Sequence, residues 1–217
     1  MENMINSYLK DFISGYSIEV IPKTVAKTES FGDILPKSTR VYLAHLQDAD
    51  ITEMVPAAKK LNDEGFTVMP HIPARVIKNK AMLGDWLSMY QNEAGVDEAL
   101  LIAGGSPKPI GDYDSSIKLI ESGLFDLAGF KRLHIAGHPE GNKDIDPDGE
   151  IKNVSEALSW KQEFSKRTDA EMAIATQFCF DANVVKKWMD DIKDDGIDIP
   201  IHIGIAGTAK LQTLLKF

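Results

Sequence analysis

The residues best suited to chemistry lie at or near the ends of short apolar segments. They are Glu19, His45, His71, the turn Gly104-Gly105-Ser106, His138, Glu140, Gln177 and His202. Histidine and glutamate exchange protons near neutral pH. Paired glycines let backbone amides approach a phosphate group. The chain therefore contains groups for proton transfer and for binding an anion.

Glu19 is the most informative of these residues because it stands inside the apolar run Ile18-Glu19-Val20-Ile21. An ionised carboxylate buried there would cost several kcal/mol unless it were paired. Burial favours the protonated form of a carboxyl group, which would make Glu19 a proton donor. The alternative is a structural salt bridge inside the fold.

The elements that position these residues alternate regularly along the chain. Seven segments rich in apolar and β-branched residues predict strands, and segments with helical spacing separate them. Several of the predicted helices end at a glycine: Gly65, Gly95 and Gly196. The predicted strands span residues 16–22, 40–46, 67–74, 98–105, 132–138, 172–180 and 199–207.

This alternation predicts a parallel α/β fold, for which we weigh two architectures. An open doubly wound sheet would carry a glycine-rich fingerprint after its first strand, where IEVIPKT stands instead. The uninterrupted repeat favours a (βα)8 TIM-type barrel with polar residues at the carboxyl ends of its strands. We predict one truncated barrel domain over residues 1–217, with 1–15 an extra helix at the barrel bottom.

Only seven βα units fit into the 217 residues, so the eighth strand of the predicted barrel is missing. A barrel without its last strand exposes two sheet edges. We expect either that the sequence is a fragment of a longer gene product or that contacts in a homo-oligomer cover the gap.

The overall charge excludes several classes of partner. With 24 Lys and Arg against 33 Asp and Glu, the net charge is −9, which disfavours nucleic acids and anionic membranes. The single cysteine, Cys179, fits a reducing compartment. We predict a cytoplasmic protein.

Four motifs, in order, resemble the methylenetetrahydrofolate reductase family. They are IEVIPKT with Glu19, MPHIPAR with His71, AGHPEG with His138, and ATQFCF with Gln177. The resemblance extends from about Tyr16 onward. It implies a (βα)8 barrel and a role in one-carbon and methionine metabolism.

The resemblance also implies a reaction and its residues. FAD would pass electrons from NAD(P)H to methylenetetrahydrofolate, giving methyltetrahydrofolate. Glu19 would be the catalytic general acid, and Gln177 would bind the folate ring. The FAD-binding residues would be His45, His71, Gly104, Gly105, Ala136, Gly137 and His138, and no metal is expected.

The sequence departs from the family pattern at three places. Ala103-Gly104-Gly105 replaces an Arg-Gly-Asp, His138 replaces a tyrosine, and Asn142 replaces a histidine. One alternative is therefore a relic or fragment that binds flavin or folate without full activity. Another is a metal-dependent barrel hydrolase that uses Glu19 and several of the histidines. The acidic loop 144–149 offers a weaker alternative, a calcium site.

Overall fold

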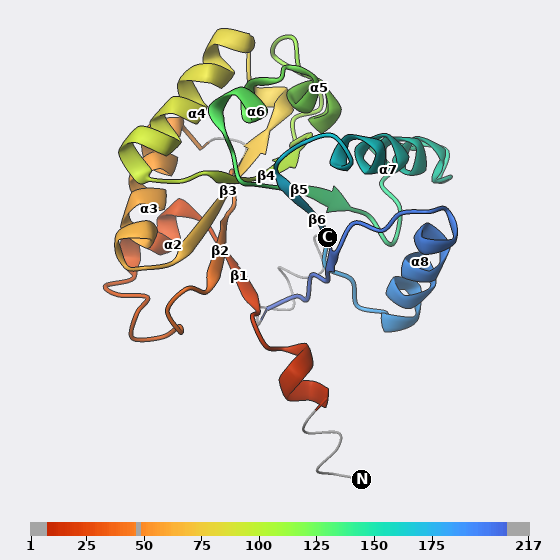
Figure 1. The fold of residues 1–217 in the computed structure, drawn as a ribbon, viewed down its shortest axis with the longest axis horizontal. Helices are drawn as coiled ribbons and strands as arrows, with labels where there is room; N and C mark the ends of the chain where they lie inside the picture. The colour runs from red at the N-terminus through yellow and green to blue at the C-terminus, as the bar shows by residue number, and fades with distance from the viewer. Residues whose placement is uncertain (1–7, 47–48, 208–217) are drawn as a thin grey trace. The chain divides into compact units, whose positions relative to one another are not determined.

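A computed structural model describes residues 8–46 and 49–207 of the chain (Figure 1). The chain divides into two compact units, the first ending at Phe130 and the second beginning at Lys131. Strands β1–β4 belong to the first unit and β5–β7 to the second. All seven strands overlap segments that the sequence predicts as strands, and the sixth (Glu171–Thr176) begins one residue before its predicted segment.

The first unit is built on four parallel strands paired in sequence order. They are β1 (Ser17–Val20), β2 (Arg40–Leu43), β3 (Thr67–Pro73) and β4 (Glu98–Ile102). In this register Glu19 lies opposite Tyr42, and Tyr42 lies opposite Met69. Parallel pairing brings the carboxyl ends of the four strands to the same edge of the sheet.

The helices of the first unit begin and end where the sequence supplies caps. The Asp50 side chain accepts a hydrogen bond from Thr52 N at 2.8 Å, and Asn79 accepts one from Met82 N at 3.0 Å. Gly95, at φ +66°, ends the helix that begins after Asn79. Within the described ranges, no helix is both long and apolar enough to cross a membrane. The helices are α2 (Pro22–Lys27), α3 (Ile51–Asp63), η1 (Ala74–Val76), α4 (Lys80–Ala94), α5 (Ser116–Glu121) and α6 (Leu124–Ala128).

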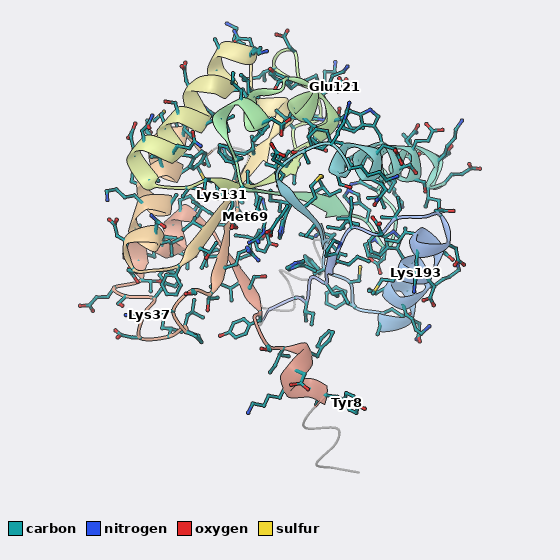
Figure 2. All side chains as sticks on the ribbon, viewed as in Figure 1. Tyr8, Lys37, Met69, Glu121, Lys131 and Lys193 are labelled. Atoms are coloured by element: carbon teal, nitrogen blue, oxygen red, sulfur yellow. The ribbon has the colours of Figure 1, made fainter. Side chains whose placement is uncertain are left out.

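The core of the first unit lies between its strands and the apolar faces of α3 and α4. The fully buried side chains of the core between the strands and these helices include Leu43, Met54, Leu61, Ile72, Leu83, Leu87, Tyr90 and Leu101. Burying apolar surface is the main stabilising term here, at about 25 cal/mol per Å² removed from water. Met69, labelled in Figure 2, is also completely buried, but on the other face of β3, which it shares with Tyr42 of β2.

The second unit contains the parallel strands β5 (Arg132–Gly137), β6 (Glu171–Thr176) and β7 (Ile201–His202), with helices α7 (Lys152–Ser165) and α8 (Ala182–Asp194). The buried Asp146 carboxylate accepts hydrogen bonds from Asn153 N at 2.9 Å and Val154 N at 3.0 Å. The Gln162 Oε1 atom accepts one from Asp198 N at 3.0 Å, just before β7. The acidic loop thus holds the start of α7 in place.

The predicted (βα)8 TIM-type barrel with its last strand missing is wrong. Closure requires every strand to pair on both sides, whereas β1 and β7 each pair on one side only within the described residues. The strands form open parallel rows, β1 to β4 and β5 to β7. The chain therefore has an open parallel α/β arrangement. The prediction that residues 1–217 form one domain stays a prediction.

The structure also differs from the predicted packing of the N-terminal helix against the barrel bottom. Residues 8–12 are helical, but Leu9, Phe12 and Ile13 are each more than half exposed. Tyr8, labelled in Figure 2, is 73% exposed. This apolar face does not cover the core, and residues 1–7 lie outside the described part of the chain.

Gly137, at the end of β5, provides a test of the packing in the second unit. A Cβ atom there would lie 2.5 Å from Ile174 Cγ2 and 3.1 Å from a ring carbon of Trp188. We expect Gly137→Ala to lower the free energy of unfolding by about 1–3 kcal/mol, because β6 and α8 would have to shift. Urea unfolding measures the loss.

Gly105→Ala is the matched control for this substitution, since a Cβ at Gly105 meets nothing within 4 Å. We expect the control to unfold at the urea concentration of the parent chain. Equal stability of Gly137→Ala and the control would contradict the packing described for β5.

Candidate functional site

The candidate site of the first unit centres on Glu19 and His71. Glu19 Oε2 lies 3.3 Å from His71 Nε2, within the range of an ion pair. The angles of this contact do not meet those of a hydrogen bond, so it is a close electrostatic contact. The Glu19 side chain is 60% exposed and that of His71 is 11% exposed. One partner therefore faces solvent, while the other is anchored in the sheet.

The exposure of Glu19 corrects part of the sequence analysis. A carboxyl group in an apolar run was expected to be buried, yet its short strand lies at the edge of the row, where β1 pairs only with β2 among the described residues. The structure thus leaves the Glu19 carboxyl group accessible to solvent. Its contact with His71 is the feature that equips it for proton exchange.

Tyr42 lies beside both members of this pair, and the sequence analysis did not identify it. Its position opposite Glu19 puts its ring beside His71, with ring centroids 6.5 Å apart in an edge-to-face arrangement. Burial raises the pKa of Tyr42 to about 12, so its hydroxyl stays protonated at neutral pH. The alternation of strand residues could have revealed it, because Glu19 and Tyr42 share one face of the sheet.

His45 follows β2 and lies against α4. Its ring stacks on Trp86 with centroids 5.5 Å apart and planes 20° from parallel. Its Nδ1 atom is 2.8 Å from Leu46 O. Burial lowers the pKa of His45, which keeps the ring neutral, so Nδ1–H donates to the carbonyl and Nε2 is left as an acceptor. Trp86 is a second residue that the sequence analysis did not single out.

The turn after β4 contains two glycines: Gly104 packs against a neighbouring residue, whereas Gly105 faces open space. Gly104 has φ +90°, and a Cβ there would lie 2.9 Å from Pro73 Cβ at the end of β3. Among the described residues, none accepts a hydrogen bond from the amides of Gly105 or Ser106. Because there is open space beside Gly105, these amides are available to donate hydrogen bonds to a bound anion.

A separate polar cluster lies in the second unit. Asn142 Nδ2 is 3.5 Å from His138 Nδ1, just after β5. Lys161 of α7 is only 6% exposed. Burial lowers the pKa of Lys161 to about 8. Burial, helped by the charge of Lys161, lowers the pKa of His138 to about 4.

The remaining predicted site residues belong to this unit as well. Gln177 N donates to Gly137 O at 2.9 Å, while the Gln177 side chain is exposed. The missing side chain of Gly137 makes room for Ile174 and Trp188, and Ala136 is the residue before it in β5. Gly137 therefore serves internal packing, not the approach of a flat ring. The folate-binding role of Gln177 stays a prediction.

A metal centre was the basis of the hydrolase alternative. Within the part of the chain that the structure describes, no group of three or more His, Cys, Asp or Glu side chains is placed to hold a metal ion. The Asp146 carboxylate of the acidic loop is already bonded to the amides of α7. No observation therefore favours the hydrolase or the calcium site.

Comparison with known proteins gives similarity to solved structures. No family model matches the chain. The crystal structure of a metagenomic short-chain oxidoreductase in complex with NADP is similar to 90% of this chain and 99% of its own, with 13% sequence identity and a TM-score of 0.37.

These findings contradict two of the predictions. No family model matches the chain, so the predicted membership of the methylenetetrahydrofolate reductase family is not supported. The FAD prediction was drawn from that resemblance, so it is corrected too. The residues predicted to bind FAD also divide between the units, with His45, His71, Gly104 and Gly105 in the first and Ala136, Gly137 and His138 in the second.

The lowered pKa of His138 gives a test by pH. Its folded pKa of about 4 lies below the ordinary value of 6.5, so the unfolded chain binds more protons between these values. With respect to His138, the free energy of unfolding is highest above pH 6.5, and it decreases as the pH falls toward 4. We expect a loss of about 2–3 kcal/mol in unfolding free energy over this window.

Urea unfolding at several pH values measures this loss, and His138→Gln is the comparison. The substitution removes the titrating ring, so its unfolding free energy should depend less on pH in the same window. Because carboxylates titrate there in both proteins, the difference between the two curves isolates His138. A His138 ring that titrates at its ordinary pKa by NMR would contradict the burial described.

Proposed function

We propose that the chain is an oxidoreductase in which Glu19 and His71 handle the proton that accompanies hydride transfer from a reduced nicotinamide dinucleotide. The observation that carries the proposal is the 3.3 Å contact between Glu19 Oε2 and His71 Nε2 at the carboxyl ends of parallel strands. Open α/β sheets bind ligands at this edge.

The pair suits the proton chemistry of a reduction. Hydride addition to the carbon of a polarised C=N or C=O bond requires a proton on the nitrogen or oxygen. The exposed Glu19 carboxyl can reach a bound substrate, and the buried His71 imidazole can return a proton to it. A positioned acid of this kind contributes about 10²–10⁴-fold in rate.

The dinucleotide would be held at the turn after β4. A reduced nicotinamide supplies the hydride when bound, and its diphosphate needs backbone donors or cations. The open amides of Gly105 and Ser106 fit that need. The glycine-rich fingerprint is absent after β1, where Ile21-Pro22-Lys23-Thr24 follows, so the turn after β4 is the better location.

The finer parts of the proposal come from the sequence. Methylenetetrahydrofolate is the substrate we propose, because its reduction places hydride on the methylene carbon and a proton on the ring nitrogen. The cytoplasmic location and the homo-oligomer are kept as parts of the same proposal. No flavin takes part in it.

Replacing Glu19 tests the proposal. We expect Glu19→Gln to lower kcat for the oxidation of NADH or NADPH by about 10²–10⁴-fold, because the amide cannot exchange a proton. The absorbance of the reduced nicotinamide measures turnover, with methylenetetrahydrofolate and a panel of small carbonyl compounds as acceptors. Glu29→Gln, at an exposed position outside the pair, is the control and should keep the parent rate.

Two outcomes would reject the proposal. One is a parent chain that oxidises neither nicotinamide with any of these acceptors. The other is turnover that Glu19→Gln leaves unchanged, which would show that the contact with His71 is only structural.

A further inference from the structure

We infer that Arg75 is a positioning residue that fixes the segment between β4 and α5, residues 103–115, into the shape that receives the dinucleotide. This inference rests on the function proposed above. Arg75 lies in η1, directly after β3, and is the last residue of the MPHIPAR motif, in which only His71 was singled out.

The guanidinium of Arg75 holds the segment near both of its ends. Nη1 donates to Ser106 O at 3.0 Å, and Nε donates to Asp114 O at 3.1 Å. These carbonyls are eight residues apart in sequence, so one planar side chain closes a loop between them. Arginine suits this role because its donors are fixed in one rigid plane, whereas lysine presents a single rotating ammonium.

The backbone adds three further hydrogen bonds between the same stretches of chain. Arg75 N donates to Ala103 O at 2.9 Å, and Ile110 N donates to Arg75 O at 3.0 Å. Asp112 N donates to Lys78 O at 3.0 Å. The segment after β4 is therefore held along its length by the residues that follow β3.

Gly111 shows how closely the two stretches approach. A Cβ atom at Gly111 would lie 1.8 Å from Lys78 O, so only glycine fits against this carbonyl. Tyr113, which comes two residues later, is buried. Backbone packing thus supports the far part of the segment, and Arg75 connects that part to the near part through Asp114 O and Ser106 O.

This arrangement ties the proposed anion-binding amides to the acid–base pair. His71 and Pro73 belong to β3, and Gly104 packs on Pro73. Arg75 follows Pro73 by two residues and holds the carbonyl of Ser106. A shift of the Arg75 side chain would therefore move the turn relative to His71 while leaving the strands in place.

Hydrogen exchange followed by mass spectrometry tests the inference without any ligand. We expect Arg75→Ala to raise the exchange rate of the hydrogen-bonded amides in this segment, those of Ile110 and Asp112, about tenfold or more, with β1–β3 unchanged. Arg75→Lys should give an intermediate rate, since it can replace only one of the two hydrogen bonds. Lys80→Ala, which removes an exposed cation from α4, is the charge-matched control and should behave like the parent.

A second measurement separates this inference from the proposed function. We expect Arg75→Ala to raise the KM for NADH or NADPH at least tenfold while kcat changes less, because the proton-handling pair remains intact. Unchanged exchange in residues 103–114, or a uniform rise throughout the first unit, would overturn the inference. Raised exchange confined to residues 103–114 in a chain that binds neither nicotinamide would support the positioning role and overturn the proposed function instead.

Discussion

Parallel pairing of β1 to β4 in sequence order is the constraint on which the candidate site depends. It brings the carboxyl ends of four strands to one edge, so residues far apart in sequence meet there. Glu19 and His71 come from strands that are not direct neighbours, and their side chains meet beside Tyr42 of the strand between them. A slip of one residue in β2 would turn Tyr42 to the other face of the sheet and remove this support.

The two ends of this sheet carry ion pairs of different character. At the amino ends of β2 and β4, Arg40 Nε lies 3.2 Å from Glu98 Oε2, with side chains 17% and 12% exposed. Both of these partners are largely enclosed, so that contact serves to join strands. At the other end, Glu19 is open to solvent while His71 is not. An acid that meets a substrate needs such asymmetry, because one group must be reachable and the other must hold its position.

The sequence predicted the elements well and their closure poorly. Local signals specify a strand or a helix end: β-branched runs give all seven strands, and Gly95 ends α4 at a positive φ. Closure of a barrel depends on pairing between distant strands, which no local pattern reports. Glu19 and His71 were predicted as site residues, but their contact could not be, since it depends on the register across β2. Arg75 was missed because its partners are backbone carbonyls, and these leave no mark on residue type.

Glycine shows most clearly why residue type alone underdetermines a site. Gly105 and Gly137 were both predicted to make room for a ligand, yet their surroundings differ. Open space lies beside Gly105, whereas Ile174 and Trp188 occupy the place of the missing side chain at Gly137. Gly111, which attracted no attention in the sequence, is the most tightly constrained, because the carbonyl of Lys78 fills the position of its Cβ. A glycine leaves room beside the backbone, and either a ligand or a neighbouring part of the protein can fill that room. Only the structure shows whether other residues of the chain already occupy it.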